Sequence, residues 1–169
     1  MEINVSQLLK EEIGSSRKNK IDETLDIVED KRDNAVSGEI SLLRTQRGIL
    51  VRAGLHTELE LTCGRCLSAF RYPLDISFEE EYIQTIDVNS GLPLETSGEP
   101  GSFTIDEHHI IDLREAVRQY ALLLIPMKPL CREGCEGLCP ECGRNLNQGP
   151  CGCTVRTVDP RWSKLMNLR

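Results

Sequence analysis

Aromatic residues are scarce in this sequence of 169 residues: they make up 4% of it, and tryptophan occurs once. Hydrophobic residues of all kinds reach 39%, so we expect Ile, Leu and Val to fill the core of one domain of ordinary size, or of a domain with a small appendage. No apolar run is long enough to span a bilayer, and the first residues lack the basic and apolar regions of a signal peptide. The sequence therefore predicts a cytoplasmic protein without a membrane partner.

Signatures of catalysis are also missing. The sequence has no G-x-S-x-G motif, no H-E-x-x-H motif and no glycine-rich phosphate loop. His108 and His109 are neighbours, and neighbouring side chains on an extended backbone point in opposite directions, so we expect a polar pair rather than a metal or acid–base site. We therefore predict that the protein is not an enzyme and has no small-molecule substrate.

Eight cysteines are the most informative residues that the sequence does contain. They fall into four pairs: Cys63 and Cys66, Cys131 and Cys135, Cys139 and Cys142, Cys151 and Cys153. In a reducing compartment such cysteines bind metal more often than they form disulfides, and zinc favours four thiolates in a tetrahedron. Residues 131–153 include few large apolar side chains, so metal binding would supply folding energy that a core cannot. We predict about one or two Zn²⁺ per chain.

The third pair, Cys139 and Cys142, gives the strongest metal signal. Pro140 restricts φ in the turn, and Gly143 can take the positive φ that lets backbone amides point back at sulfur. Two groupings stay open. In one, the third pair joins the fourth and the first pair joins the second; in the other, the third pair joins the second. The short spacing of the fourth pair also leaves open that one of its cysteines is free.

Apolar residues recur with a period of two from residue 21 to residue 62. This alternation, with short turns between segments, predicts consecutive antiparallel strands. We expect strands at residues 38–45, 49–54, 55–62 and 70–83. Pro73 indicates an edge or a bulge in the last of them. The acidic run Glu79, Glu80 and Glu81 is expected to be a solvated face.

Two helices are expected. Residues 5–13 predict a short one with Ser6 as N-cap, followed by a polar basic loop at residues 14–20. The stronger helix has apolar residues at helical spacing after Asp112, which with Glu115 would form a capping box. A long loop is expected at residues 87–102.

These elements predict an α+β fold. We expect an antiparallel β meander or partly open barrel packed by one main helix, with a C-terminal Cys-rich, zinc-ribbon-like segment. The first domain would span residues 1–130. Residues 131–169 would form the Cys-rich segment and a tail that packs on this domain, with Trp162 lying against it. Cys63 and Cys66 follow a meander strand rather than a βαβ strand, so we do not expect thioredoxin-like redox activity.

Several motifs, in this order, carry a resemblance to a known family. They are Cys63-Gly64-Arg65-Cys66-Leu67, Asp112-Leu113-Arg114-Glu115, Leu124-Ile125-Pro126-Met127-Lys128-Pro129-Leu130-Cys131, Gly137-Leu138-Cys139-Pro140-Glu141-Cys142-Gly143 and Asp159-Pro160-Arg161-Trp162. The sequence resembles the YceD family, the large ribosomal RNA subunit accumulation proteins, over nearly its whole length. The resemblance implies a non-enzymatic role in the synthesis, processing or accumulation of large-subunit ribosomal RNA, with ribosomal RNA or a pre-ribosomal particle as partner.

The first functional hypothesis is therefore an assembly factor with structural zinc that contacts ribosomal RNA. The net charge of −7 argues against simple coating of nucleic acid, but residues 126–169 are mildly basic. The candidate phosphate contacts are Arg65, Lys128, Arg132, Arg144, Arg156 and Arg161. The alternative is a zinc-stabilised module that binds a large-subunit ribosomal protein through residues 79–81. A zinc-dependent nuclease is a third, weaker hypothesis.

Overall fold

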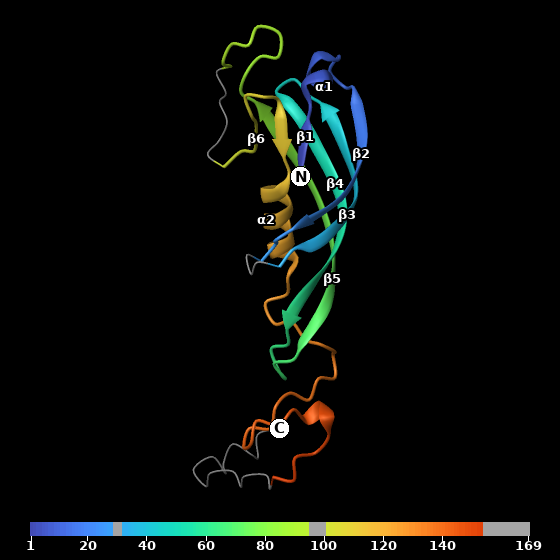
Figure 1. The fold of residues 1–169 in the computed structure, drawn as a ribbon, viewed down its shortest axis with the longest axis vertical. Coiled ribbons are helices and arrows are strands. Elements are labelled where there is room, and N and C mark those ends of the chain that lie inside the picture. The colour runs from blue at the N-terminus through green and yellow to red at the C-terminus, as the bar shows by residue number, and fades with distance from the viewer. Residues whose placement is uncertain (29–31, 95–100, 154–169) are drawn as a thin grey trace, which may run out of the picture.

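The computed structural model describes residues 1–28, 32–94 and 101–153. Its main feature is a five-stranded sheet with the strand order β2-β3-β4-β5-β6 (Figure 1). The strands are β2 (Ser16–Leu25), β3 (Asn34–Arg44), β4 (Gly48–Thr62), β5 (Ala69–Gln84) and β6 (Thr104–Ile105). The first four run antiparallel to their neighbours, and β6 runs parallel to β5. The predicted meander is therefore confirmed, and the described strands form an open series rather than a barrel.

Smaller elements complete the fold. Strands β1 (Glu2–Asn4) and β7 (Ile110–Asp112) form a separate two-stranded sheet. The helices are α1 (Ser6–Lys10), α2 (Arg114–Leu124) and the 3₁₀ turn η1 (Leu146–Gln148). The main sheet with one packed helix makes the fold α+β, as predicted. In the described part of the chain, no helix is long and apolar enough to cross a membrane.

The core lies on one face of the sheet. Along β4 the odd-numbered positions are mostly buried and the even-numbered positions after residue 50 are exposed, because successive side chains of a strand point to opposite faces. Leu55 pairs with Ile76 and Ala53 with Phe78, so the buried positions of β4 and β5 lie opposite one another. The period-two pattern of the sequence thus predicted the buried face correctly.

Helix α2 covers this face beside β5 (Figure 1). Its buried positions are small or branched (Ala116, Val117 and Ala121), which lets the helix approach the sheet closely. The ring of Tyr120 stacks on Phe78 with 5.0 Å between centroids. Aromatic residues are scarce in this sequence, and this pair is one of the aromatic contacts that stabilise the fold.

Two predicted segments differ from the structure. Residues 49–54 and 55–62 belong to one strand, β4, because Gly54 continues the ladder opposite Ser77 instead of breaking it. The predicted loop at residues 14–20 is mostly the first half of β2. Since β2 is an edge strand whose one buried residue is Ile21, its sequence carries almost no alternation.

The predicted helix starts are also corrected. Helix α1 ends at Lys10, and Ser6 is its first residue rather than its N-cap. The Oδ1 atom of Asn4 accepts hydrogen bonds from the backbone N–H and the hydroxyl of Ser6. At α2, the N-cap position falls on Leu113, and no capping box forms.

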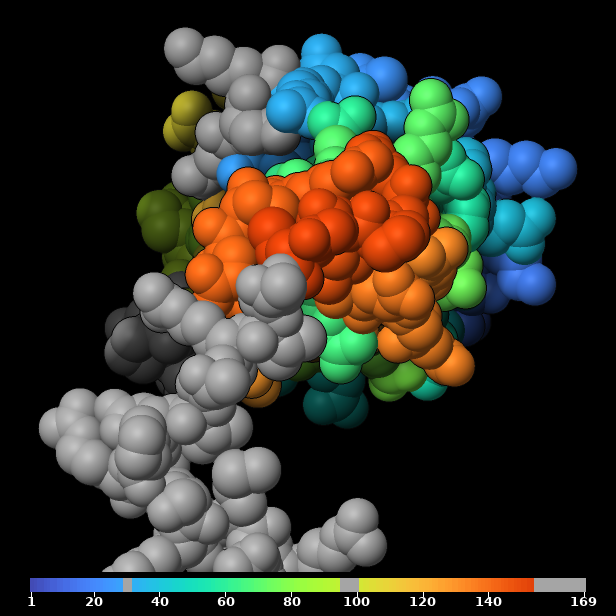
Figure 2. All heavy atoms as spheres, turned by 90° about the horizontal axis from the view of Figure 1, so that it is seen from below, coloured from blue at the N-terminus to red at the C-terminus, as the bar shows by residue number. Residues whose placement is uncertain are grey.

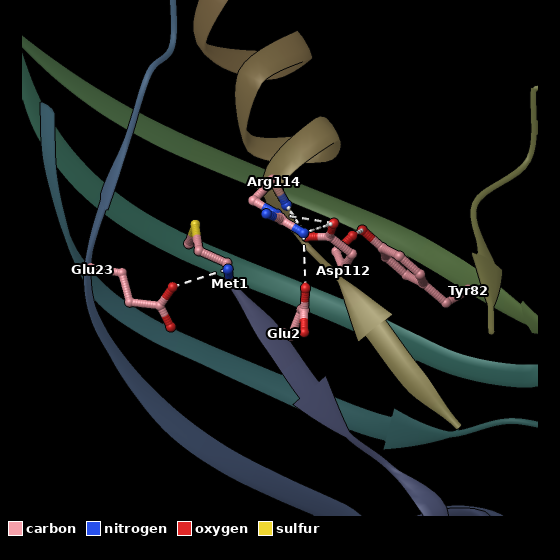
Figure 3. A network of polar contacts seen from close by, with 6 residues as sticks. All are labelled: Met1, Glu2, Glu23, Tyr82, Asp112 and Arg114. Carbon is pink, nitrogen blue, oxygen red and sulfur yellow. Dashed lines mark hydrogen bonds and ion pairs between the residues drawn. The ribbon is translucent and has the colours of Figure 1, made fainter. Parts of the chain in front are cut away.

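The carboxylate of Asp112 nevertheless organises the start of α2 (Figure 3). It accepts hydrogen bonds from the backbone N–H and the side chain of Arg114, which also pairs with Glu2 at 2.8 Å. Burial opposes its ionisation, but the Arg114 hydrogen bonds and charge hold the pKa of Asp112 below its usual value. The Tyr82 hydroxyl donates to the Asp112 carbonyl at 3.2 Å. These contacts join β1, β5, β7 and α2.

The β4–β5 hairpin extends beyond the rest of the sheet. The last β3 partner of β4 is Val36, which lies opposite Thr57. From residue 58 onward, β5 is the one strand among the described residues that pairs with β4. We call this two-stranded extension, residues 58–62 and 69–73, the stalk. Pro73 lies in the stalk opposite Glu58, at an edge of β5, as the sequence predicted. Figure 1 shows the stalk leading to the cysteine-rich end.

Two glycines in neighbouring strands allow a matched test of the sheet packing. A Cβ atom on Gly38, whose φ is +154°, would lie 2.2 Å from the Gly54 carbonyl oxygen, whereas a Cβ atom on Gly54 would have nothing within 4 Å. We expect Gly38→Ala to lower the free energy of unfolding by about 2 kcal/mol. Gly54→Ala should leave it unchanged or raise it by up to about 1 kcal/mol. Urea unfolding measures both, and equal losses would contradict this account.

Candidate metal centres

Four cysteines from distant parts of the chain meet beyond the stalk. We call Cys63, Cys66, Cys131 and Cys135 the inner cluster; their Sγ atoms all lie within 4.8 Å of one another. The Sγ atoms of Cys63 and Cys135 are 3.8 Å apart, and those of Cys66 and Cys131 are 3.7 Å apart. Sulfurs around a tetrahedral zinc ion would be roughly 3.8 Å apart, given Zn–S bonds of about 2.3 Å. The donor set therefore fits zinc.

The other four cysteines form a second group, which we call the outer cluster. It consists of Cys139, Cys142, Cys151 and Cys153, whose Sγ atoms also lie within 4.8 Å of one another. The structure thus adopts the first of the two groupings that the sequence left open, and it places both members of the fourth pair in one cluster. All eight cysteines are free of disulfides. Each group could hold one metal ion.

The stalk positions the first half of the inner cluster. Cys63 directly follows β4, and Cys66 lies two residues before Ser68, whose carbonyl accepts the N–H of Cys63 at 2.9 Å. Leu67 closes the turn by donating to the Cys63 carbonyl at 3.0 Å, with φ at +57°. A small apolar group packs around these sulfurs, separate from the main core: Phe70, Leu130 and Leu138. Burial in this group shields the inner cluster from water.

The segment after residue 128 brings the second half. The N–H of Gly64 donates to the Pro129 carbonyl at 2.8 Å, which fastens the incoming chain to the first turn. The Arg65 guanidinium donates to the Cys135 carbonyl at 3.0 Å. A Cβ atom on Gly137 would lie 3.2 Å from the Arg65 carbonyl oxygen, so the two turns are in close contact. The inner cluster therefore joins residues on both sides of the predicted boundary at residue 130, which itself stays a prediction.

A tight turn builds the outer cluster, as the sequence predicted. The N–H of Gly143 donates to the Cys139 carbonyl at 2.9 Å, and Gly143 has a φ of +71°. The N–H of Cys139 in turn donates to the Arg144 carbonyl at 2.8 Å. Figure 2 looks onto this end of the molecule, where residues 131–153, in orange and red, form much of the surface over the hairpin tip.

Residues 51–169, which include every cysteine, match the model of a family described as large ribosomal RNA subunit accumulation protein YceD. The chain belongs to the YceD family. This confirms the resemblance drawn from the motifs.

Relatives of this YceD chain are uncharacterized proteins of mycobacteria. Those of Mycobacterium tuberculosis and Mycobacterium bovis are 31% identical over 121 residues, which cover 72% of the chain and 56% of the relative. One of Mycobacterium leprae is 28% identical over 106 residues, covering 63% of the chain and 46% of the relative. The chain therefore spans about half the length of the curated relatives it matches. No solved structure matches it significantly.

The thiols of this YceD chain are electrostatically unequal. Backbone N–H groups directed at Cys63 lower the pKa of its thiol to about 6, and those of Cys142 and Glu141 lower the pKa of Cys139 to about 7. By contrast, burial and the neighbouring sulfurs raise the pKa of Cys131 to about 12. The sulfurs of its cluster raise the pKa of Cys153 to about 12. A bound divalent cation would overcome the raised pKa values of Cys131 and Cys153, because it deprotonates coordinating thiols.

Two asparagines that sequence reasoning did not single out as site residues connect the clusters. The Asn147 amide nitrogen lies 3.3 Å from the Cys135 sulfur, and its oxygen accepts the N–H of Glu136 at 3.0 Å and an Arg132 N–H at 2.6 Å. The Asn145 oxygen accepts the N–H and the amide of Asn147, at 3.0 and 2.8 Å. The signals in the sequence were their position between cysteine pairs and the motif Asn145-Leu146-Asn147, which is part of the resemblance to the family.

The predicted phosphate-contacting residues that the structure describes, Arg65, Lys128, Arg132 and Arg144, lie near the two clusters. Arg65 and Arg132 donate to the neutral groups described above, and both are exposed. Lys128 and Arg144 are exposed and have no acidic partner in the part of the chain that the structure describes. Two further candidates, Arg156 and Arg161, lie outside the described residues, as does Trp162.

The metal content gives a direct prediction. We expect purified protein to contain about two zinc ions per chain, one for each group of four sulfurs. Cys63→Ser should remove about one ion by disrupting the inner cluster, Cys139→Ser about one by disrupting the outer cluster, and the double variant nearly both. Elemental analysis of the refolded or native chain gives the ratios. A single substitution that removed both ions would contradict two independent sites.

The Asn147 contact with sulfur gives a second prediction. Asn147→Ala should weaken zinc binding by the inner cluster by about 10- to 100-fold, because the amide orients the Cys135 sulfur and shares its charge. Competition with a chromogenic chelator measures this in a Cys142→Ser background, where the inner cluster alone holds metal. Gln148→Ala is the matched control, since that side chain is exposed. Equal affinities in the two variants would disprove a role for Asn147.

Proposed function

We propose that this chain is a non-enzymatic factor in the accumulation of large-subunit ribosomal RNA, and that zinc holds its cysteine-rich end in a shape that contacts RNA. The family match over residues 51–169 carries the proposal, because it links both cysteine clusters to a family described by its effect on this RNA. The partner would be ribosomal RNA or a pre-ribosomal particle. We place the activity in the cytoplasm, where these particles form.

The donor chemistry supports a structural role for zinc. Both clusters offer four sulfur donors and no carboxylate or histidine among the grouped residues. Zinc sites with four thiolates are usually closed, whereas a hydrolytic site keeps an open position for water or substrate. The clusters therefore favour a zinc-ribbon-like clamp over the nuclease hypothesis.

The pairing of arginines supports contact with RNA at the cysteine-rich end. Around the sheet, all described arginines except the half-buried Arg44 pair with acids: Arg17 with Glu11, Arg32 with Glu60, Arg47 with Glu81, Arg52 with Glu79, Arg71 with Glu58, Arg114 with Asp112, and Arg118 with Glu115. The described cations at the cysteine-rich end, Arg65, Lys128, Arg132 and Arg144, form no such ion pairs with acids of the described residues. A cation without an acidic neighbour can neutralise a phosphate at lower cost.

Arg65 and Lys128 also face a common hollow. Together with Gly64 and Leu130 they line a depression at the first cysteine turn. The hydrogen bond from Arg65 to the Cys135 carbonyl fixes the guanidinium while its other N–H groups remain available. A phosphate of a single-stranded RNA segment would fit between the two cations, with sugar or base against Leu130.

The contacts of the acidic run weigh against the alternative function. Glu79 pairs with Arg52, Glu80 accepts a hydrogen bond from Tyr120, and Glu81 accepts one from Thr45. Glu79 is exposed and Glu80 and Glu81 are half-buried, so the run faces solvent, but its charge is partly neutralised by its own neighbours. A module that holds a basic ribosomal protein stays the alternative proposal, with less free charge at this surface than the sequence indicated.

Salt-dependent RNA binding tests the proposed function. Affinity for a large-subunit ribosomal RNA fragment should fall steeply with salt, and Lys128→Gln with Arg144→Gln should reduce the slope of log K against log salt by about 2, one for each lost phosphate contact. Arg47→Gln with Arg71→Gln removes the same charge from the sheet and should leave the slope unchanged. Fluorescence anisotropy between 50 and 200 mM salt measures all three proteins.

Failure of this test has two forms. Equal slopes for both double variants would show that the cysteine-rich end does not make the phosphate contacts. No RNA binding at any salt, together with recovery of a large-subunit ribosomal protein after crosslinking in cells, would favour the alternative function.

A further inference from the structure

The two clusters have the same donors but differ in their exposure to solvent. In the inner cluster three cysteines are buried and Cys131 is half-buried. In the outer cluster Cys139 is buried and Cys151 half-buried, while Cys142 and Cys153 are exposed. Cysteine oxidation follows thiolate character and access to the oxidant. Since metal-bound sulfurs are thiolates in both clusters, access is the difference that remains.

We propose that the outer cluster is an oxidation site: a peroxide converts Cys142 and Cys153 to a disulfide, the outer cluster loses its metal, and the inner cluster keeps its own. The two exposed sulfurs already lie within 4.8 Å of each other. A bond between Cys151 and Cys153 would instead close a small, strained ring across one residue. The proposal depends on a metal ion in the outer cluster, and it does not depend on RNA binding.

The chemistry balances with hydrogen peroxide as the oxidant. The Cys142 thiolate attacks one peroxide oxygen, the O–O bond breaks, and the departing hydroxide takes a proton to become water. The resulting sulfenic acid is attacked by the Cys153 thiolate, which forms the S–S bond and releases a second hydroxide that is protonated to water. Two sulfurs lose two electrons in total and the peroxide gains two. The remaining two sulfurs hold a divalent cation weakly.

Local structure explains why the inner cluster would resist the same reaction. Cys63 is 0% exposed and lies under the apolar group that includes Phe70 and Leu130. Sγ atoms of either cluster would have to approach to about 2.05 Å for a disulfide, but the turn that carries Cys63 and Cys66 is fixed between β4 and β5. The hairpin would have to distort to allow this.

The outer cluster can change without opening the sheet. All its cysteines come from residues 139–153. Within the described residues, one hydrogen bond joins this segment to the sheet side of the molecule, from the Asn145 amide to the Ser68 hydroxyl at 3.1 Å. Because the Cys139 N–H donates to the Arg144 carbonyl, loss of the outer metal would also release the turn that carries Arg144. A resulting loss of RNA affinity rests on the proposed function.

The experiment uses the full chain loaded with zinc and treated with limiting hydrogen peroxide. A chromogenic chelator should report release of about one of about two zinc ions, thiol titration should show the loss of about two thiols, and peptide mass spectrometry should find the Cys142–Cys153 disulfide. A dithiol reductant with added zinc should restore the starting state. These readouts need no RNA, so they separate failure of this proposal from failure of the proposed function.

Two variants test whether burial decides the order. Phe70→Ala uncovers the inner cluster and should speed its oxidation about 10-fold while leaving the outer cluster unchanged. Met127→Ala removes a fully exposed side chain nearby and should change neither rate. Simultaneous release of both ions from the unaltered protein, an inner-cluster disulfide formed first, or loss of the outer metal with Cys142 and Cys153 still reduced would each overturn the proposal.

Discussion

The crowding of sulfur at one end of the molecule is the constraint on which that end depends. Eight thiols lie in two groups with Sγ atoms within 4.8 Å, and without a cation the burial and neighbouring sulfurs drive the pKa of Cys131 to about 12. A divalent ion would attract the thiolates that otherwise disfavour one another's ionisation. The free energy of metal binding would then become folding free energy for a segment with little apolar surface. The sheet does not depend on the ion, because its core is a separate apolar cluster.

The β4–β5 hairpin connects these two sources of stability. The part of the hairpin before the stalk contributes buried residues to the main core, and its tip supplies Cys63 and Cys66. Since no third strand of the described residues pairs with the stalk beyond Thr57, its own pairing and the inner cluster must hold the cysteine-rich end in place. This arrangement also separates the charges. Within the described residues, the arginines around the sheet other than Arg44 pair with acids, whereas Arg65, Lys128, Arg132 and Arg144 beyond the stalk do not.

The sequence predicted those features that local patterns record. Period-two alternation predicted the meander and its buried face, and C-x2-C spacing with Gly143 predicted a metal turn. The first half of strand β2 was missed because this exposed edge strand buries too little there to show a pattern. The choice of cysteine partners, and the role of Asn147, depend on contacts between turns brought together by the stalk, which no local pattern contains.

Under the proposed function, the charge of two metal-filled clusters would limit how this end binds RNA. A zinc ion with four thiolates carries roughly −2, so two filled clusters outweigh the few nearby cations. Attraction of the whole end to a polyanion is therefore weak, and contact has to be local. Exposed side chains such as Lys128 and Arg144 can reach a phosphate outside the clusters, while backbone N–H groups directed at sulfur spread the thiolate charge. Because Arg144 lies on the turn that the outer cluster holds, the position of this proposed contact would depend on the more exposed of the two clusters.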